Sequence, residues 1–456
     1  MAIAVTPGKR AVRSIWVALL VCRCIPSFSG EPSGPLVYLF TLAPRYEPHA
    51  WMEGGERFPA GATVYLASGK QRERRLIAAD FSASADAAVS YDGARVLFAG
   101  KVAPAAPWQI WETTLGGGTP RRITSGDTDC FRPLYLPDGG VVYTRRLERG
   151  TVLELARPGV AKVERLTFAP GKYLTDTVLQ DGRILIEAVE ENSGGNKREL
   201  FTLYPDGTGL ESLRCDHGHD RAEGRQMSTG DVIFEERGRL ASIRAALASQ
   251  TDVIQPKVRQ LGPVAEVGPD RWLLTVQRPG NSHAGIFLWN VSSRRLLSLE
   301  NPQNASAVQP VMAAPRTPPR DFPSALTGSR RGANALCLNT RQSLAPYQGV
   351  AQWVRVYGQG PRGEPVILGR AEVAGDGSFF VQVPGDRPIR FELLDGEGRS
   401  LRSEQNWIWF RSGEQRICAG CHAGPEQAAE NRLPDVLRGR PSPASLTGSA
   451  ANPKPE

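Results

Sequence analysis

The sequence predicts an all-β protein: a six-bladed β-propeller, with seven blades as the alternative, followed by a small β-sandwich-like domain. Its 456 residues include 48 Gly and 36 Pro, a composition that favours turns and short strands over long helices. Five Asp-Gly or related turns, each followed by alternating apolar residues, recur at intervals of 46, 43, 49 and 40 residues. A period of this length is typical of propeller blades with about four strands each.

The repeated turns define five regular units within residues 31–302. They are Asp92-Gly93, Asp138-Gly139, Asp181-Gly182, Thr229-Gly230 and Pro269-Asp270. A less regular sixth unit precedes them, with expected strands at Leu36–Phe40, Thr63–Ala67 and Arg75–Ile77. Because a four-stranded sheet with two apolar faces must pack between neighbours, such units are expected to assemble radially. The alternative is an irregular β-sandwich in which the Asp-Gly hairpins recur by coincidence.

These repeats resemble the TolB-like, WD40-like propellers of secreted proteins. In that family a serine-aspartate-glycine type turn precedes a strand, and its nearest form here is Ser90-Tyr91-Asp92-Gly93. The resemblance covers residues 31–302 and implies an architecture but little chemistry.

Residues 303–331 are rich in Pro, Ala and Ser and are expected to form a linker or covering strap. Residues 332–424 form the second expected domain, because strand-like runs resume there and are separated by turns. The runs are Trp353–Tyr357, Pro365–Leu368, Ser378–Val383 and Ile389–Leu394. Residues 425–456 are expected to be a disordered tail.

The first 29 residues read as a signal peptide. Lys9, Arg10 and Arg13 precede the apolar stretch Ser14–Cys22, and Ser27-Phe28-Ser29 offers a small-x-small cleavage site. A buried strand or helix is the alternative interpretation of the apolar stretch. The basic residues before it and its position at the start of the chain favour a signal peptide, so we expect export to the periplasm or the medium. Because no later segment has the ~18–20 apolar residues that cross a bilayer, no integral membrane span is expected after signal removal.

The net charge of +8 is spread along the chain, with basic and acidic residues interleaved. Nucleic-acid binding is therefore not expected.

Five cysteines follow the signal segment: Cys130, Cys215, Cys337, Cys418 and Cys421. In an oxidising compartment Cys130 and Cys215 could pair, or they could be separate small buried side chains. The sequence does not choose between these readings, but the last two cysteines belong to a recognisable motif.

That motif is Cys418-Ala419-Gly420-Cys421-His422, a C-x-x-C-H pentad that is the attachment signature of c-type haem. Two thiols add across the porphyrin vinyl groups, and the adjoining His422 imidazole is the expected proximal ligand of the haem iron. A zinc site would need a tetrahedral ligand set, and a thioredoxin-like dithiol would need an α/β context. One covalent haem c is therefore the expected cofactor.

The surrounding residues resemble the hydrazine synthase alpha subunit family, specifically its middle domain. The resemblance spans residues 309–424 and is carried by Leu368-Gly369, Asp376-Gly377-Ser378-Phe379, Val383-Pro384, Leu394-Asp395-Gly396, Trp407, Ser412-Gly413-Glu414 and the pentad. It implies a c-type haem, with His422 as proximal ligand, behind a propeller. Because this chain has one C-x-x-C-H and then a tail, we expect a single-haem relative and not a hydrazine-making enzyme.

The sequence does not identify the sixth ligand of the haem iron. Candidates are Met227, Met312 and the pair His217 and His219, although a solvated turn or a separate metal site suits the two histidines equally. The aromatic run Trp407-Ile408-Trp409-Phe410 either walls one face of a porphyrin or packs in the sandwich.

Two functions remain. The first is an exported c-type haem protein that transfers electrons or carries out small-molecule redox chemistry, with the propeller as docking platform and a redox protein or small molecule as partner. The second is a non-catalytic propeller scaffold that binds a protein or ligand, its haem structural or absent. No catalytic residue is assigned, and hydrolase signatures do not stand out.

Overall fold

The computed structural model describes residues 36–68, 73–190, 197–214, 216, 218–244, 249–253, 255–324, 326, 331–343, 346–421, 431–439 and 442–448. The expected signal segment, His422, Cys215 and His217 lie outside these ranges. Regular structure in the described residues is almost entirely β-strand, which confirms the all-β prediction.

Within the described part of the chain, none of the helices has the length and apolar character needed to span a bilayer.

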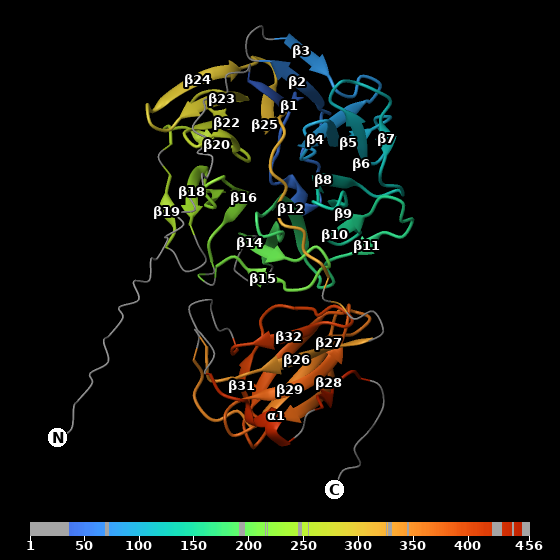
Figure 1. Ribbon diagram of the computed structural model, residues 1–456, viewed down its shortest axis with the longest axis vertical. Coiled ribbons are helices and arrows are strands. Elements are labelled where there is room, and N and C mark those ends of the chain that lie inside the picture. Colours follow the sequence, from blue (N-terminus) through green and yellow to red (C-terminus); the bar gives the residue numbers. More distant parts are fainter. Residues whose placement is uncertain are drawn as a thin grey trace, which may run out of the picture. The chain divides into compact units, whose positions relative to one another are not determined.

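Six antiparallel sheets form the propeller, and Figure 1 shows them set around a common centre. Blade 1 contains β25 (Ser306–Met312), β1 (Val37–Ala43), β2 (Thr63–Ser68) and β3 (Glu73–Leu76), with the short helix η1 (Ala50–Glu53) between β1 and β2. Blade 2 contains β4 (Ala83–Val89), β5 (Arg95–Lys101), β6 (Gln109–Thr114) and β7 (Arg121–Arg122). Blade 3 contains β8 (Cys130–Tyr135), β9 (Val141–Arg146), β10 (Thr151–Ala156) and β11 (Glu164–Arg165).

The remaining three blades repeat this order. Blade 4 contains β12 (Lys172–Val178), β13 (Ile184–Glu190), β14 (Lys197–Leu203) and β15 (Glu211–Ser212). Blade 5 contains β16 (Arg221–Gln226), β17 (Val232–Glu236), β18 (Arg239–Ile243) and β19 (Thr251–Asp252). Blade 6 contains β20 (Arg259–Gln260), β21 (Ala265–Gly268), β22 (Arg271–Gln277), β23 (Ala284–Asn290) and β24 (Arg295–Glu300). The described residues thus give six blades, and the seven-bladed alternative is wrong.

The Asp-Gly turns connect the first two strands of a blade, as the repeat predicted. In blade 2 the turn places Gly93 at φ +72°, and Gly139 in blade 3 has φ +84°. Glycine suits these positions because a Cβ disfavours this left-handed conformation. The strand that follows each turn is buried on both faces: Val96, Leu97 and Phe98 in β5 are fully buried.

The chain closes the propeller by pairing β25 with β1, so the first blade combines both ends of the repeat region. Figure 1 shows the gold β25 beside the blue β1. The predicted start of the linker at residue 303 is therefore wrong, because residues 306–312 form the inner strand of blade 1. Such closure removes the free strand edge that an open ring would expose.

The inner strands share one irregularity. The ladders shift register within β4, β8, β12, β16 and at the β1–β25 pair, as β-bulges do. At four of these sites a residue other than glycine takes a left-handed backbone: Asp86, Arg132 and Glu223 at φ +55° and Gln309 at φ +56°. Bulges of this kind redirect side chains, and here they hold four buried polar groups at the inner strands.

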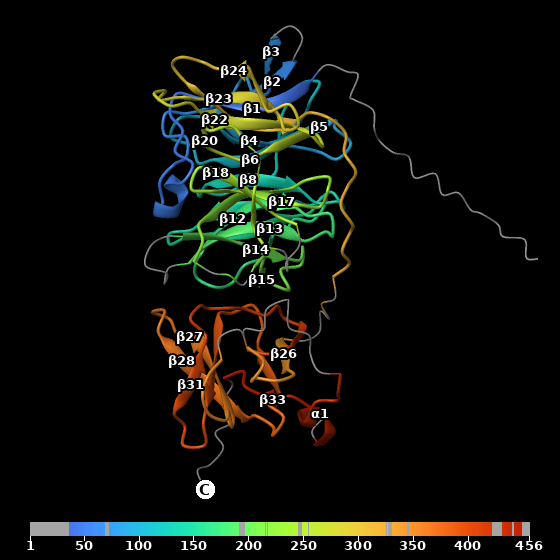
Figure 2. The same ribbon diagram turned by 90° about the vertical axis from the view of Figure 1, so that its left-hand side faces the viewer.

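The C-terminal domain contains two four-stranded sheets, which Figure 2 shows as separate layers with β27, β28 and β31 in one and β26 and β33 in the other. One sheet contains β28 (Pro365–Glu372), β27 (Trp353–Gln359), β30 (Ile389–Leu394) and β31 (Ser400–Ser403). The other contains β32 (Gln415–Cys418), β26 (Gly332–Cys337), β29 (Phe379–Pro384) and β33 (Ala444–Ser445). Between them lies a core that includes Val354, Val356, Val381 and Leu393. The β-sandwich prediction is confirmed.

The expected disordered tail is wrong where the structure describes it. The helix α1 (Asp435–Gly439) is followed by β33, which pairs in parallel with β29. Leu446 is 5% exposed and belongs to the sandwich core. The apolar contact of Leu446 explains why a Pro- and Ser-rich segment is ordered here.

Candidate functional site

The C-x-x-C loop begins at the end of β32, an edge strand of its sheet. Cys418 and Cys421 are free thiols of intermediate exposure. Burial raises the pKa of the Cys418 thiol to about 11, so this sulfur is protonated at neutral pH. Beside it, Ile417 is 66% exposed, an unusual position for a large apolar side chain. The loop therefore presents two thiols and an apolar side chain on the edge of the domain.

A third thiol lies next to this pair. In the parallel ladder of β26 and β32, Cys337 is the direct partner of Cys418. A hydrogen bond to the Cys421 thiol, together with burial, holds the pKa of Cys337 well above its usual value. Cys337 is 2% exposed and belongs to the sandwich core, whereas Cys421 packs against that core from outside. The sequence alone gives Cys337 no role, because the parallel strand pairing that places it here is non-local.

Gly420 is required by a close approach of two backbones. A Cβ at this position would collide with the carbonyl oxygen of Gln342 and lie 2.8 Å from that of Asn339. These oxygens belong to the turn that follows β26, which is itself held by a hydrogen bond from Gln342 N to Asn339 O of 3.0 Å. A glycine within the pentad is therefore needed for the loop to lie against this turn.

Replacing Gly420 with alanine is expected to destabilise the C-terminal domain by about 1–3 kcal/mol, the usual cost of forcing extra volume into a packed site. Urea unfolding of the full chain measures this loss. The matched control is Gly375→Ala, since a Cβ at Gly375 would meet nothing within 4 Å. Equal stability of the two variants would show that the approach of the loop to the turn is not tight.

The other candidate ligands lie within propeller blades. Met227 is 3% exposed and packs in the core that contains Trp272, and Met312 ends β25 and packs against the core of blade 1. The His219 Nδ1 atom lies 2.8 Å from Glu236 Oε1, within hydrogen-bonding distance. The structure thus gives each of these three side chains a place in the propeller, and His217 is outside the described residues.

The Cys130 thiol is free and fully buried, and burial raises its pKa to about 11. Its proposed partner Cys215 lies outside the described residues. Cys130 thus has the character of a small packing residue in the core of blade 3.

A buried charged network was missed by sequence reasoning. Arg132 donates from Nη2 to Asp176 Oδ1 at 2.6 Å and from Nη1 to Glu223 Oε2 at 2.8 Å. Glu187 accepts from the backbone N–H of Glu223 at 2.8 Å. Asp86, Arg132, Asp176 and Glu223 occupy equivalent inner-strand positions, 46, 44 and 47 residues apart. The sequence therefore does contain a signal for this network, namely a charged residue that recurs at the spacing of the blades.

The carboxyl groups of this network differ in the direction in which their pKa values are shifted. Burial, reinforced by Asp176 and Glu223, holds the pKa of Glu187 well above its usual range. Burial also acts on Glu223, but the attraction of Arg132 and Arg225 outweighs it and lowers the pKa of that carboxyl. Arg132 therefore favours the ionised form of Glu223, whereas burial and the neighbouring carboxyl groups favour the protonated form of Glu187.

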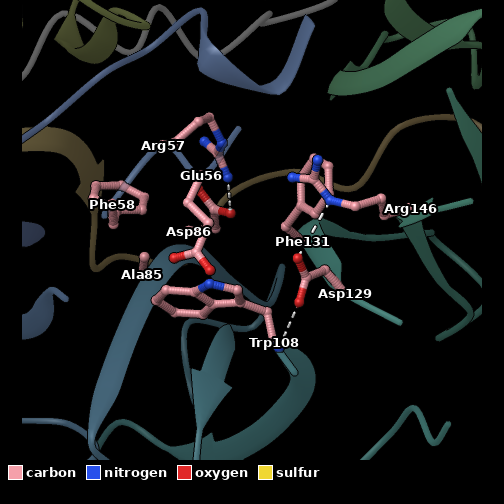
Figure 3. A pocket seen from close by; sticks show the side chains of 9 residues that line it. All are labelled: Glu56, Arg57, Phe58, Ala85, Asp86, Trp108, Asp129, Phe131 and Arg146. Atoms are coloured by element: carbon pink, nitrogen blue, oxygen red, sulfur yellow. Dashed lines mark hydrogen bonds and ion pairs between the residues drawn. The ribbon is translucent and has the colours of Figure 1, made fainter. Parts of the chain in front are cut away.

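Figure 3 shows a small pocket beside this network. Arg57 forms an ion pair with Asp86, and Arg146 lies 3.3 Å from Asp129. The cavity of about 20 Å³ has room for about one water molecule. Within the described residues the buried Arg57 Nη1 group has no hydrogen-bond partner.

These features define a class: a six-bladed β-propeller joined to a β-sandwich that presents a C-x-x-C loop at a sheet edge. Residues 347–423 match the family model of the hydrazine synthase alpha subunit middle domain. The hydrazine synthase subunit alpha of Kuenenia stuttgartiensis is 36% identical over 58 residues, which are 13% of this chain and 7% of that protein. The resemblance expected from the sequence is confirmed, and the match spans a small part of that relative.

Two solved structures are similar over longer stretches. The alignment with the structure of Kuenenia stuttgartiensis hydrazine synthase covers 89% of this chain and 71% of the hydrazine synthase chain, with a TM-score of 0.78 and 18% identity. The alignment with the crystal structure of TolB from Acinetobacter baumannii covers 62% of this chain and 68% of the TolB chain, with a TM-score of 0.47 and 14% identity. The first similarity shows that propeller and sandwich occur together in a known fold.

Proposed function

We propose that this chain is an exported c-type haem protein that transfers electrons or carries out small-molecule redox chemistry. Cys418 and Cys421 would attach one haem through thioether bonds, and His422 would be the proximal ligand of its iron. The propeller would serve as the docking platform for a redox protein or a small molecule. Export to the periplasm or the medium belongs to the proposal, because thioether formation occurs outside the cytoplasm.

The observation that carries this proposal is the C-x-x-C-H pentad at the edge of a domain that matches the hydrazine synthase alpha middle domain. Both thiols of the pentad are free, and Cys418 ends β32, which among the described residues pairs with one neighbouring strand, β26. The exposed Ile417 offers apolar contact for a porphyrin. The residues present therefore fit a covalently attached haem.

A bound haem supplies one-electron chemistry at an iron whose potential depends on its axial ligands and surroundings. The chain's own residues hold the attachment loop in place. Gly420 keeps the loop against the turn after β26, and the parallel ladder fixes Cys418 beside Cys337. The buried Cys337 lies behind Cys421 in the core, so the two pentad thiols are the more accessible ones.

The test is to produce the full chain in a bacterium that matures c-type cytochromes and to measure its intact mass and absorption spectrum. Wild type is expected to gain the mass of one haem and to show a Soret band that survives denaturation. Cys418→Ala/Cys421→Ala is expected to lose both signals, because haem attachment requires the pentad thiols.

Cys337→Ser is the matched control, because it removes the neighbouring thiol of the same cluster and leaves Cys418, Cys421 and His422 unchanged. It is expected to retain the haem. A wild-type chain without added mass, from cells that mature a reference cytochrome in parallel, would reject the haem proposal and leave the scaffold function.

A further inference from the structure

We propose that the propeller binds a compact multivalent oxyanion, an oligophosphate or a small polycarboxylate, in a groove between blades 5 and 6. The groove has a volume of about 530 Å³, within the range of ~300–1,000 Å³ that is usual for small-molecule sites. It is lined by the start of β18, by the segment that leads into β20 and by the turn after β22. Strands β18 and β20 lie side by side in Figure 1 and in Figure 2. This inference concerns the propeller alone and does not depend on haem.

The charged side chains that line this groove are all basic. They are Arg239, Lys257, Arg259 and Arg278, and no acidic residue is among the described residues of the lining. All four are exposed, and none of them forms an ion pair within the described part of the chain. Four like charges around one concave volume repel one another, and an anion bound between them would offset that repulsion.

The carboxylate that strand pairing brings nearest to the groove is engaged elsewhere. Glu236 is the partner of Arg239 in the antiparallel ladder of β17 and β18. Its Oε1 atom lies 2.8 Å from His219 Nδ1, and its Oε2 atom accepts from Gln250 Nε2 at 2.6 Å. The guanidinium of Arg239 is therefore left for a ligand.

Arg259 also lines the adjoining pocket beside His49, which contains one further cation, Arg237, and three carboxyl groups. Each of these carboxyl groups contacts an arginine other than these two: Asp220 and Glu235 contact Arg198, and Glu223 contacts Arg132. The positive charge of Arg259 is thus not neutralised from that side, and Arg237 adds to it.

The protein holds two of the guanidinium groups in place. Arg278 lies over the ring of Phe287, with its Cζ atom 4.7 Å from the ring centroid. Arg259 is the ladder partner of Gln277, whose Oε1 atom accepts from Arg259 Nη1 at 3.4 Å. The stem of Arg259 passes close to Gly238, where a Cβ would lie 3.2 Å from Arg259 Cγ. Side chains that are positioned in advance lose less conformational entropy when an anion binds.

The residue types of the groove indicate the chemistry of its ligand. A planar guanidinium donates two parallel hydrogen bonds to two oxygens of one phosphate or carboxylate group, and three of the four basic residues are arginines. A monovalent anion would neutralise only one of the four charges. A ligand that carries three or more negative charges within a small volume matches the groove, and oligophosphates and tricarboxylates are compounds of this kind.

The test is calorimetric titration of the full chain at pH 7 with sodium tripolyphosphate and with tricarballylate, which distinguish phosphate from carboxylate as the preferred group. Orthophosphate is the probe of lower charge, and a hexaglutamate peptide is the probe for an acidic protein segment. At least one of the two compact probes is expected to bind more tightly than orthophosphate and the peptide, and to bind more weakly as the salt concentration rises.

Arg259→Gln and Arg278→Gln are each expected to weaken binding of that probe by about ten- to hundredfold, the effect of losing a hydrogen bond between charged groups. Arg295→Gln is the matched control, because Arg295 is an exposed arginine of the same blade that lies outside the groove and has no ion pair within the described residues. It is expected to bind the probe as wild type does. All three variants change an exposed side chain, so without an anion their melting temperatures should stay close to that of wild type.

Three results would overturn the proposal. The first is that neither compact probe binds, or that orthophosphate binds as tightly as they do. The second is that Arg295→Gln weakens binding as much as Arg259→Gln, since the attraction would then come from the overall charge of the protein and not from the groove. The third is tighter binding of the hexaglutamate peptide, which would identify the groove as a docking surface for an acidic protein.

Discussion

Replacing Arg132 with methionine is expected to lower the free energy of unfolding by about 3–5 kcal/mol, the usual effect of removing one partner from a buried charge pair. The side chain of Arg132 is 5% exposed, and those of Asp176 and Glu223 are 0% and 7% exposed. Methionine fills much of the same volume but leaves two carboxylates without their guanidinium. Urea unfolding of both proteins at pH 7 measures the difference.

Arg244→Met is the matched control for this prediction. Arg244 also faces an aspartate, Asp231 at 3.4 Å, but its side chain is 85% exposed. An exposed ion pair contributes less than about 1 kcal/mol, so this variant should unfold almost as wild type does. Comparable losses in the two variants would mean that the network of Arg132 does not stabilise the propeller.

The Arg132→Met variant also has an expected pH dependence. Without the guanidinium, burial is opposed less strongly, so the folded-state pKa of Asp176, which burial already raises, increases further and that of Glu223 also increases. The folded state would bind more protons than the unfolded state, so stability decreases as the pH rises. The difference in free energy of unfolding between the variant and wild type should therefore become smaller as the pH falls from about 7 to about 5.

The blades could be predicted because the residues that specify each hairpin are close together in the sequence. Each Asp-Gly turn and the strands on either side of it lie within a few residues of one another, so the hairpin register follows from the turn. The inner strand β25 could not be predicted in this way. Its sequence contains Pro310, which lies in the irregular part of the ladder with β1, and its partner strand begins at Val37.

The site was predictable only in part, for the same reason. The spacing of Cys418, Cys421 and His422 is visible in the sequence because the chemistry of attachment fixes it. The approach of Cys337 depends on a parallel pairing between β26 and β32, and a six-residue strand with the sequence GANALC has little apolar pattern.

The aromatic run before the pentad belongs to packing and not to a porphyrin wall. Trp409 is fully buried in the core of blades 3 and 4, and its Nε1 donates to Gly207 O at 3.2 Å. Its ring meets Tyr173 edge-on, with centroids 5.9 Å apart. The next residue, Phe410, belongs to the core of the sandwich. Two adjacent side chains thus anchor the C-terminal domain to the propeller.

Replacing Trp409 with alanine is therefore expected to cost about 3–5 kcal/mol, as for other large-to-small changes in cores, and to uncouple the unfolding of the two domains. Calorimetry should show one transition for wild type and two for the variant, since the remaining contacts, such as Arg411 over Phe168 at 5.1 Å, are smaller. Trp353→Ala is the control, because Trp353 is half-buried and stacks on Arg370 within the sandwich. If Trp353→Ala separated the transitions equally well, Trp409 would be an ordinary core residue and not the link between the domains.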